Sequence, residues 1–405
     1  MQVGVRHYVA VAMLSLVGVT ACTSTKKPES SVPPTDLVAA VATSVPETTT
    51  AHATFLGEGE GSLNLIAWPG YTEREWVDPF ESNTGCKLHV KVGNTSDEMI
   101  RLMRTGEYDG VSASGDATLR LIAAGDVVPV DTDLIPAYKD IFDALKLRAW
   151  NSVGGQAYGI PQGRGANILM YNTAQVKPAP NSWSVVFDPQ SPYKGRITAY
   201  DSPIYIADAA VYLMASQPEL GIMNPYALDE KQFAAAVDLL RRQKPLINDY
   251  WSDYAKSQAA FKSGATLVGT TWQVIASGAN GEGTPVDTVL PKEGATGWSD
   301  TWMVAAKAKH PNCMYLWMDW IAGPEANAQI AEFYGQAPSN KLACSRTQDP
   351  NHCATYHADD ETYFSKVWYW TTPTRECLDG RGPICSDYLA WASAWTAIKS
   401  GRPVK

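Results

Sequence analysis

From about residue 63 onward the chain alternates short runs of β-type residues with segments of helical periodicity. Residues 63–67 and 87–92 are predicted as strands, and a helix pattern between them continues through Trp76. Thr95-Ser96-Asp97-Glu98 is a capping box, which predicts the start of a helix directly after the second strand. Residues 108–112 follow as another strand. This alternation indicates an α/β domain with a largely parallel sheet.

A second series of elements is expected after an extended stretch at residues 157–161. The predicted strands are 166–171, 197–200 and 265–269, and the predicted helices lie at 119–124, near 207–214, and at 231–242 and 257–262. Of these, 231–242 is strongly amphipathic, as expected for a helix that packs on one face of a sheet. The body of the protein therefore contains two α/β units without an internal repeat.

The first 56 residues differ from this body. Residues 1–21 have a basic start followed by an apolar run at 8–19, which is too short to span a bilayer and indicates an export signal. Val19-Thr20-Ala21-Cys22 resembles the lipobox of bacterial lipoproteins, which implies a lipid on Cys22. The alternative is an ordinary signal peptide with an incidental cysteine. Residues 22–56 are rich in Ser, Thr and Pro and are expected to form a flexible tether.

Composition narrows the function. The chain has 405 residues, 45% of them hydrophobic, with a formal net charge of -9, so neither wholesale disorder nor a basic nucleic-acid surface is expected. It has 14 Trp and 19 Tyr but only 8 Phe. Trp and Tyr add a polar group and an electron-rich face to their apolar bulk. The excess is consistent with a Trp-rich core or with rings gathered around a ligand.

Six cysteines remain after Cys22, and an even number in an exported chain favours disulfides. They are Cys86, Cys313, Cys344, Cys353, Cys377 and Cys385. The last four form two closely spaced pairs, for which local pairing is predicted. Cys86 and Cys313 are then either a third disulfide or two buried free thiols. A metal site of Cys344, His352, Cys353 and His357 is disfavoured because no paired CxxC spacing supports it.

Several stretches of the body resemble the spermidine/putrescine-binding type of solute-binding proteins of ABC importers. They are Ala67-Trp68-Pro69-Gly70-Tyr71, Tyr108-Asp109 with Ser112-Ala113-Ser114, 125–131, Tyr158-Gly159-Ile160-Pro161, Leu290-Pro291-Lys292-Glu293-Gly294, Trp298-Ser299-Asp300 and Tyr334-Gly335-Gln336-Ala337-Pro338-Ser339-Asn340. Each stretch is weak alone. Their shared order and spacing carry the resemblance.

The resemblance implies an α/β fold of two lobes, of the type II periplasmic-binding-protein kind, joined by crossing hinge strands near Pro161 and Asp300. Lobe 1 would comprise residues 57–162 and 299–343, and lobe 2 would comprise 163–298 and 344–405. Such a monomer closes on a small solute without a cofactor and delivers it to the permease of an ABC importer. The lipid on Cys22 would hold it at the outer face of the cell membrane.

Family members hold protonated amines between aromatic rings and pair them with carboxylates. The matching positions here are Trp68, Tyr71, Ser114, Trp272, Trp298 and Asp300. Independently of the family, an ammonium group above an indole face gains about 0.5–2 kcal/mol, and a buried carboxylate neutralises it. These residues are therefore the expected amine site, whereas any one of the tryptophans alone would more simply be a core residue.

The chain also departs from the family. Ser202 and Tyr205 stand where polyamine binders have acids, although Asp201 and Asp208 are near, and Arg164 stands where they have a tryptophan. If Arg164 faces the ligand, it favours a carboxylate, and the solute would be a zwitterion such as an ω-amino acid. Asp116, at a family tyrosine position, could restore a second acid and keep a diamine such as putrescine possible. Trp368 or Trp370 could line the cleft, with packing in the core preferred.

Two other classes of function are an exported enzyme and a structural or adhesive lipoprotein. An exported enzyme is disfavoured because no HExxH or GxSxG motif is present. A structural or adhesive lipoprotein would use its tryptophans for packing or for a protein interface. Binding of a small solute that depends on Trp298 and Asp300 would separate the importer function from both.

Overall fold

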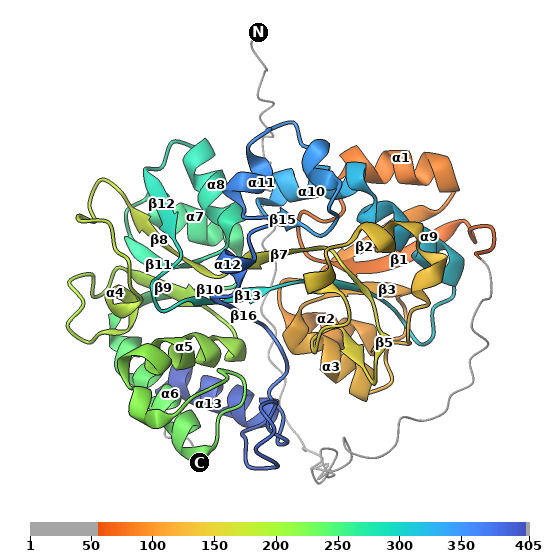
Figure 1. Ribbon diagram of the computed structural model, residues 1–405. Helices are drawn as coiled ribbons and strands as arrows, with labels where there is room; N and C mark the ends of the chain where they lie inside the picture. Colours follow the sequence, from red (N-terminus) through yellow and green to blue (C-terminus); the bar gives the residue numbers. More distant parts are fainter. Residues whose placement is uncertain (1–55, 402–405) are drawn as a thin grey trace, which may run out of the picture. The chain divides into compact units, whose positions relative to one another are not determined.

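The computed structural model describes residues 56–401. The predicted signal peptide, Cys22 and the tether up to residue 55 lie outside the described residues. Two five-stranded sheets and a four-stranded sheet that connects them organise the described part (Figure 1). Below, lobe 1 and lobe 2 denote the elements around the first and second sheets.

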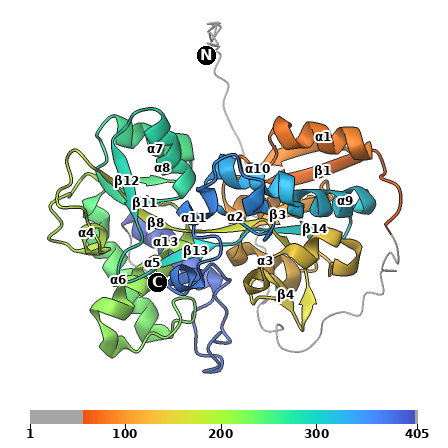
Figure 2. The same ribbon diagram turned by 45° about the horizontal axis from the view of Figure 1, so that its top comes forward.

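The sheet of lobe 1 has the strand order β2-β1-β3-β14-β6. Its strands are β1 (Ser62–Ala67), β2 (Lys87–Val92), β3 (Gly110–Ala113), β6 (Ile160–Pro161) and β14 (Thr301–Val304). The first three are parallel, whereas β14 runs antiparallel to β3 and β6. Helices α1 (Arg74–Thr84), α9 (Pro311–Ala322) and α10 (Pro324–Tyr334) cover one face, and α2 (Ser96–Met103) and α3 (Gly115–Ala123) cover the other (Figure 2).

The sheet of lobe 2 has the order β10-β9-β11-β8-β12. Its strands are β8 (Ile168–Asn172), β9 (Ile197–Tyr200), β10 (Ile247–Trp251), β11 (Val268–Thr271) and β12 (Val286–Val289). β9 is parallel to β10 and β11, and β8 is antiparallel to β11 and β12. The flanking helices are α4 (Ser184–Phe187), α5 (Ile206–Ser216), α6 (Glu230–Gln243), α7 (Tyr254–Lys262), α8 (Gln273–Gly281) and α13 (Tyr388–Ser400).

The third sheet lies between these two and has the order β15-β7-β13-β16. Its strands are β7 (Gly163–Ala166), β13 (Ala295–Trp298), β15 (Ala337–Pro338) and β16 (Val367–Tyr369). Two connections run from this hinge sheet directly into lobe 1, from β7 back to β6 and from β13 on to β14. The backbone N–H of Gln162 donates to the Asp300 carbonyl at 2.8 Å, which ties these two connections together. Two short helices, α11 (His352–Thr355) and α12 (Glu361–Phe364), pack beside the hinge sheet.

The predicted α/β fold of two lobes is confirmed, with each sheet mixed. The capping box is partly confirmed, because Thr95 accepts a hydrogen bond from the Glu98 N–H whereas the Glu98 carboxylate accepts from the Asn94 N–H. Three helices begin or end three or more residues from their expected bounds, one of them being α7, which was predicted at 257–262 and begins at Tyr254. The helix predicted through Trp76 is α1, which continues to Thr84 with Pro79 inside it. The helix predicted at 119–124 begins four residues earlier, because Ser114 takes the extended N-cap conformation.

Three disulfides are present. Cys344–Cys353 and Cys377–Cys385 have the local pairing that the sequence predicts. The question left open for Cys86 and Cys313 is settled as a disulfide, which joins the start of β2 to α9 within lobe 1. The Cys344–Cys353 disulfide leaves these two cysteines unable to serve as thiolate ligands in the disfavoured metal site. Within residues 56–401 no helix is both long and apolar enough to cross a bilayer.

Candidate functional site

Asp300 lies at the junction of the hinge sheet and lobe 1, between the last residue of β13 and the first of β14. Its side chain is 4% exposed. The Tyr71 hydroxyl donates to one carboxylate oxygen at 2.8 Å, and the Ser114 hydroxyl donates to the other at 2.5 Å. The Tyr71 hydroxyl also lies 3.2 Å from Gln336 Oε1. Three of the residues expected together from the sequence, Tyr71, Ser114 and Asp300, are thus in direct contact.

The charge of Asp300 is not balanced by any side chain of the described residues. Burial, with a smaller contribution from the neighbouring Asp116, raises the pKa of this carboxyl to about 6 against the opposing hydrogen bonds from Ser114 and Tyr71. No Lys, Arg or His within residues 56–401 forms an ion pair with Asp300. A buried carboxylate without a cation is costly, so the site is electrostatically complementary to a cationic ligand.

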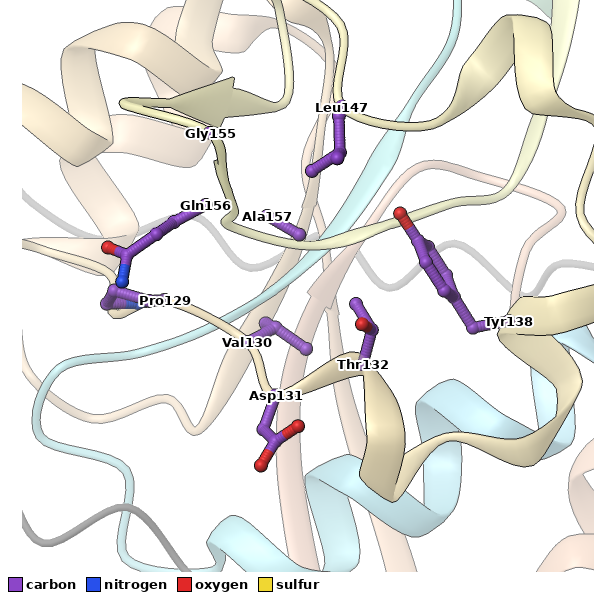
Figure 3. Close-up of a pocket in the computed structure, with 9 residues that line it drawn as sticks. All are labelled: Pro129, Val130, Asp131, Thr132, Tyr138, Leu147, Gly155, Gln156 and Ala157. Atoms are coloured by element: carbon purple, nitrogen blue, oxygen red, sulfur yellow. The ribbon is translucent and has the colours of Figure 1, made fainter.

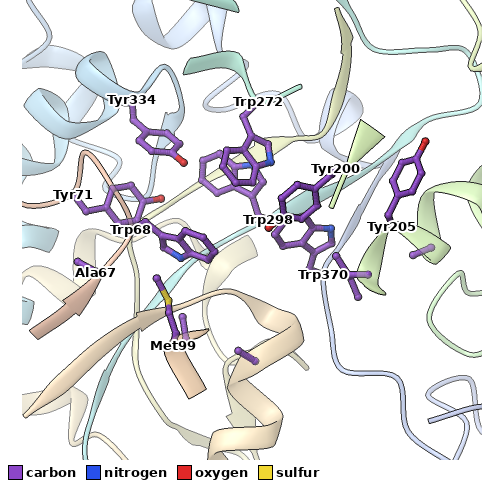
Figure 4. Close-up of a cluster of buried hydrophobic side chains, with 14 of the residues drawn as sticks. Ala67, Trp68, Tyr71, Met99, Tyr200, Tyr205, Trp272, Trp298, Tyr334 and Trp370 are labelled. Carbon is purple, nitrogen blue, oxygen red and sulfur yellow. The ribbon is translucent and has the colours of Figure 1, made fainter. Parts of the chain in front are cut away.

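Tyr71, which contacts this carboxylate, belongs to a cluster of aromatic rings drawn from both lobes (Figure 4). Trp68 follows β1 of lobe 1, and Trp272 caps α8 of lobe 2. Their ring centroids are 6.2 Å apart at an interplanar angle of 78°. Trp298, from β13, packs edge-to-face against Tyr334 at 5.5 Å. The three tryptophans are each less than 9% exposed, so the rings are drawn from the two lobes into one enclosed cluster.

Two glycines of β7 allow the rings to lie this close to the hinge sheet. A Cβ on Gly165 would lie 2.4 Å from the Trp298 ring, and a Cβ on Gly163 would lie 2.7 Å from Gln336 Nε2. Side chains alternate along a strand, so these glycines lie on the same face of β7, toward Trp298 and Gln336. The residue between them, Arg164, points to the opposite face.

Asp116 is a second buried acid, in the first turn of α3. Ser96 donates to Asp116 Oδ1 at 2.7 Å, and the buried Oδ2 has no hydrogen-bond partner within the described chain. Burial raises the pKa of Asp116 to about 6, although the Ser96 hydrogen bond opposes the shift. Because Asp116 also raises the pKa of Asp300, the two carboxylates are close enough to interact electrostatically.

A third buried acid, Asp208, belongs to a chain of hydrogen bonds that ends at Trp272. Trp272 Nε1 donates to Asn167 Oδ1 at 2.9 Å, Asn167 Nδ2 donates to Thr296 Oγ1 at 2.6 Å, and that hydroxyl donates to Asp208 at 3.0 Å. Burial raises the pKa of Asp208 to about 7. These hydrogen bonds connect the Trp272 indole to the hinge sheet and to α5, and so fix its orientation.

Sequence reasoning did not assign Tyr200, Tyr334 or Gln336 to this cluster, and it named Trp370 only as a possible cleft residue. Tyr200 stacks on Trp370 with 5.7 Å between centroids and 11° between planes, and it also packs against Trp272 at 5.3 Å. Tyr334 packs on Tyr71 at 5.0 Å, with both hydroxyl groups directed toward the centre of the cluster (Figure 4). Tyr334 and Gln336 lie in a stretch that carried the family resemblance, which was the available signal. Trp370 had been expected to prefer the core.

Arg164 is not directed at Asp300, contrary to the expectation that it might receive a ligand carboxylate. Its guanidinium lies 3.7 Å above the Phe364 ring and donates to the Ala358 carbonyl at 2.9 Å and to Glu361 at 2.7 Å. The physical reason is the alternation along β7, which turns Arg164 toward α12. Its charge is therefore already paired within the protein.

Tyr205 packs within lobe 2 and makes no contact with Asp300. It is 1% exposed, stacks on Phe187 at 5.9 Å and accepts a hydrogen bond from Gln243 Nε2 at 2.8 Å. Figure 4 shows it on the far side of Tyr200 and Trp370 from Trp68. Because Pro203–Tyr205 forms a turn of 3-10 helix, Tyr205 points into the core of lobe 2. Ser202 precedes this turn as its N-cap, 7% exposed.

Two pockets lie outside the ring cluster. One of about 240 Å³ adjoins Trp298 and Gln336 on the side of Arg164 and Tyr356. A more open one of about 390 Å³ lies on lobe 1 between Val130, Tyr138 and Leu147 (Figure 3). Within the described residues no group of three or more His, Cys, Asp or Glu side chains could hold a metal ion.

Comparison with known proteins identifies the family. The profile of the bacterial extracellular solute-binding proteins matches residues 75–350. The chain belongs to this family. This solute-binding protein is 24% identical over 324 residues to the spermidine/putrescine-binding periplasmic protein of Escherichia coli K12, covering 78% of this chain and 88% of the relative.

Solved structures share its fold. The spermidine/putrescine ABC transporter substrate-binding protein of Streptococcus pneumoniae has a TM-score of 0.67 at 18% identity, over 84% of this chain and 98% of its own. The TpPotD lipoprotein of Treponema pallidum has a TM-score of 0.69 at 18% identity, over 83% and 99%. The two-lobed fold of this solute-binding protein is thus that of periplasmic binding proteins.

Proposed function

We propose that this solute-binding protein captures a small amine-bearing solute, a polyamine or a related amino compound, and delivers it to the permease of an ABC importer. The observation that carries the proposal is Asp300. It is a buried carboxylate with no cationic partner in the described chain, and its hydrogen-bond partner Tyr71 belongs to the ring cluster contributed by both lobes. An ammonium group on the ligand would supply the missing charge.

The surrounding groups support the same ligand chemistry. A protonated amine can donate to Asp300 while its carbon chain lies against Trp68, Trp272 and Trp298. Indole faces attract cations and exclude water, which strengthens the ion pair. Asp116 would pair a second ammonium group, which favours a diamine or longer polyamine over a monoamine. The curated relative in Escherichia coli is described as binding spermidine and putrescine.

The alternative solute is a zwitterion such as an ω-amino acid, or a quaternary amine. Arg164 gives the zwitterion no support, because its guanidinium is paired with Glu361. A different observation favours it: three buried N–H donors at the rings, Trp68 Nε1, Trp298 Nε1 and Gln336 Nε2, have no acceptor within the described chain. A ligand carboxylate could accept from them, whereas a polyamine could not.

A thermal-shift screen tests the proposal. Spermidine, putrescine, 4-aminobutanoate and choline should be compared, each with an uncharged diol of similar length as control. A ligand at 100 times its dissociation constant stabilises the folded protein by about 2.7 kcal/mol, which gives a clear rise in melting temperature. We expect putrescine or spermidine to raise it and the diols not to. If no amine shifts the melting temperature, the proposed function is wrong.

We further propose that lobe 1 comprises residues 57–162 and 299–343 and that lobe 2 comprises residues 163–298 and 344–405.

We also propose that the protein works as an exported monomer, held to the outer face of the cell membrane by a lipid on Cys22. The lipobox-like sequence supports the anchor. In a bacterial host fed radiolabelled palmitate, the full chain should incorporate label and the Cys22→Ala variant should not. Label retained by the variant would contradict the anchor.

A further inference from the structure

The chain between the hinge sheet and α13 runs along both lobes. We call residues 370–388 the C-terminal strap. It begins after β16, where the Trp370 N–H donates to the Gly297 carbonyl at 2.7 Å. It ends at Tyr388, the first residue of α13. This helix belongs to lobe 2, where Lys399 pairs with Asp201 at 2.6 Å and Trp391 packs on Phe233 at 6.0 Å.

The strap contacts lobe 1 at the first turn of α3. The Thr372 hydroxyl donates to the Asp116 carbonyl at 2.8 Å. The Trp370 carbonyl lies so close to Gly115 that an added Cβ would be 1.8 Å from it, so only glycine fits there. The backbone that carries the Asp116 carboxylate is therefore packed directly against the strap.

Tyr388 makes a second contact across the lobes. Its hydroxyl donates to Asp97 Oδ1 at 3.0 Å, and the Arg120 guanidinium lies 3.9 Å above its ring. Arg120 and Asp97 are themselves paired at 2.7 Å. A residue at the start of a lobe 2 helix thus contacts α2 and α3 of lobe 1 together.

The same two helices carry Asp116 and its hydrogen-bond partner. Ser96 on α2 donates to Asp116 on α3, and the next residue on α2, Asp97, pairs with the residue one turn further along α3, Arg120. The two pairs are therefore consecutive contacts between α2 and α3. One includes a carboxylate of the site and the other is held by Tyr388.

We propose that Tyr388 is a positioning residue, which holds α2 and α3 of lobe 1 against lobe 2 and so fixes Asp116 at the site. The part of this proposal that concerns Asp116 rests on the proposed function, in which Asp116 pairs with the ligand. Loss of the Tyr388 ring would free Arg120 and separate the lobes at this point. The arrangement in which α2 and α3 contact lobe 2 through Tyr388 would then be less populated even without ligand.

The first experiment needs no ligand. Nitroxide labels at Leu147→Cys in lobe 1 and Met223→Cys in lobe 2, both at exposed positions, report the distance between lobes by pulsed EPR. Tyr388→Ala should broaden the distribution toward longer distances. Leu389→Ala, which changes the adjacent exposed residue of α13, should match the parent protein. If Tyr388→Ala also matches the parent protein, the positioning role is wrong.

The second experiment measures putrescine binding by calorimetry. Tyr388→Ala should weaken binding roughly tenfold, and Tyr388→Phe, which keeps the ring beneath Arg120, should recover most of it. In an Asp116→Asn background the Tyr388→Ala effect should be smaller, because the part that acts through Asp116 is removed and only the part that acts through separation of the lobes remains. Fully additive effects would overturn the action through Asp116. Failure of the unmodified protein to bind any amine would instead count against the proposed function, and the EPR result would still decide the role of Tyr388.

Discussion

Replacing Asp300 by Asn is expected to abolish high-affinity binding of the amine solute. The variant keeps the side-chain shape and leaves an oxygen to accept from Ser114, but it removes the charge that would pair with the ammonium group. Removing one partner of a buried, hydrogen-bonded charge pair costs about 2–5 kcal/mol. The dissociation constant should therefore rise by about 30-fold to several thousandfold. Isothermal titration calorimetry with putrescine and spermidine measures the change directly.

A matched control is available in lobe 2. Asp287 accepts a hydrogen bond from the Tyr171 hydroxyl at 3.3 Å, as Asp300 does from Tyr71, but it is exposed on β12 and lies away from the ring cluster. Asp287→Asn should leave affinity unchanged within about twofold. Equal losses in the two variants would show a general effect of net charge, and an Asp300→Asn variant that bound normally would remove Asp300 from the site.

The sequence predicted the elements of both lobes better than the side chains of the site. Alternating strand and helix patterns are local properties, and they placed β2 and β9 at their observed bounds. Side chains alternate between the two faces of a strand, so an error of one residue in the predicted register reverses the direction of every side chain in it. Arg164 illustrates this dependence, because its neighbours Gly163 and Gly165 face Gln336 and Trp298 while Arg164 itself faces Phe364.

The remaining site residues come from distant parts of the chain. Trp370 stacks on Tyr200, 170 positions earlier, and Thr372 donates to Asp116, 256 positions earlier. No periodicity in one sequence encodes such pairings. The six positions carried by the family resemblance could be predicted because members of the family share them, whereas the direction of Tyr205 depends on the turn of 3-10 helix that follows β9.

The stability of the ligand-free protein is expected to fall as the pH rises from about 5 to 7.5. Burial raises the pKa values of Asp116 and Asp300 to about 6 and of Asp208 to about 7, above the value of about 3.9 for an unfolded chain. Between these limits the folded protein binds more protons than the unfolded one. Unfolding free energy therefore decreases with pH, and the loss is complete above the folded-state pKa values. Urea unfolding at a series of pH values measures this slope.

Substitution isolates the contribution of each acid. Other groups also titrate, and the lowered pKa of buried His352 contributes the opposite slope, but such terms cancel in the difference between a variant and the parent protein. The stability of Asp300→Asn relative to the parent protein should increase by on the order of 1.5 kcal/mol between pH 5 and pH 7.5, because the folded carboxyl ionises near pH 6 whereas the unfolded one is already ionised at pH 5.

The affinity for an amine ligand should change with pH in the direction opposite to the stability of the ligand-free protein. An ammonium group pairs with the ionised carboxylates, so putrescine affinity should increase as the pH rises through about 6, where Asp116 and Asp300 ionise. The same charges that destabilise the empty site thus become the source of binding energy. A ligand-free stability that rose from pH 5 to 7.5 and was unaffected by Asp300→Asn would show that these carboxylates already have a counter-charge in the empty protein. The electrostatic argument for a cationic solute would then fail.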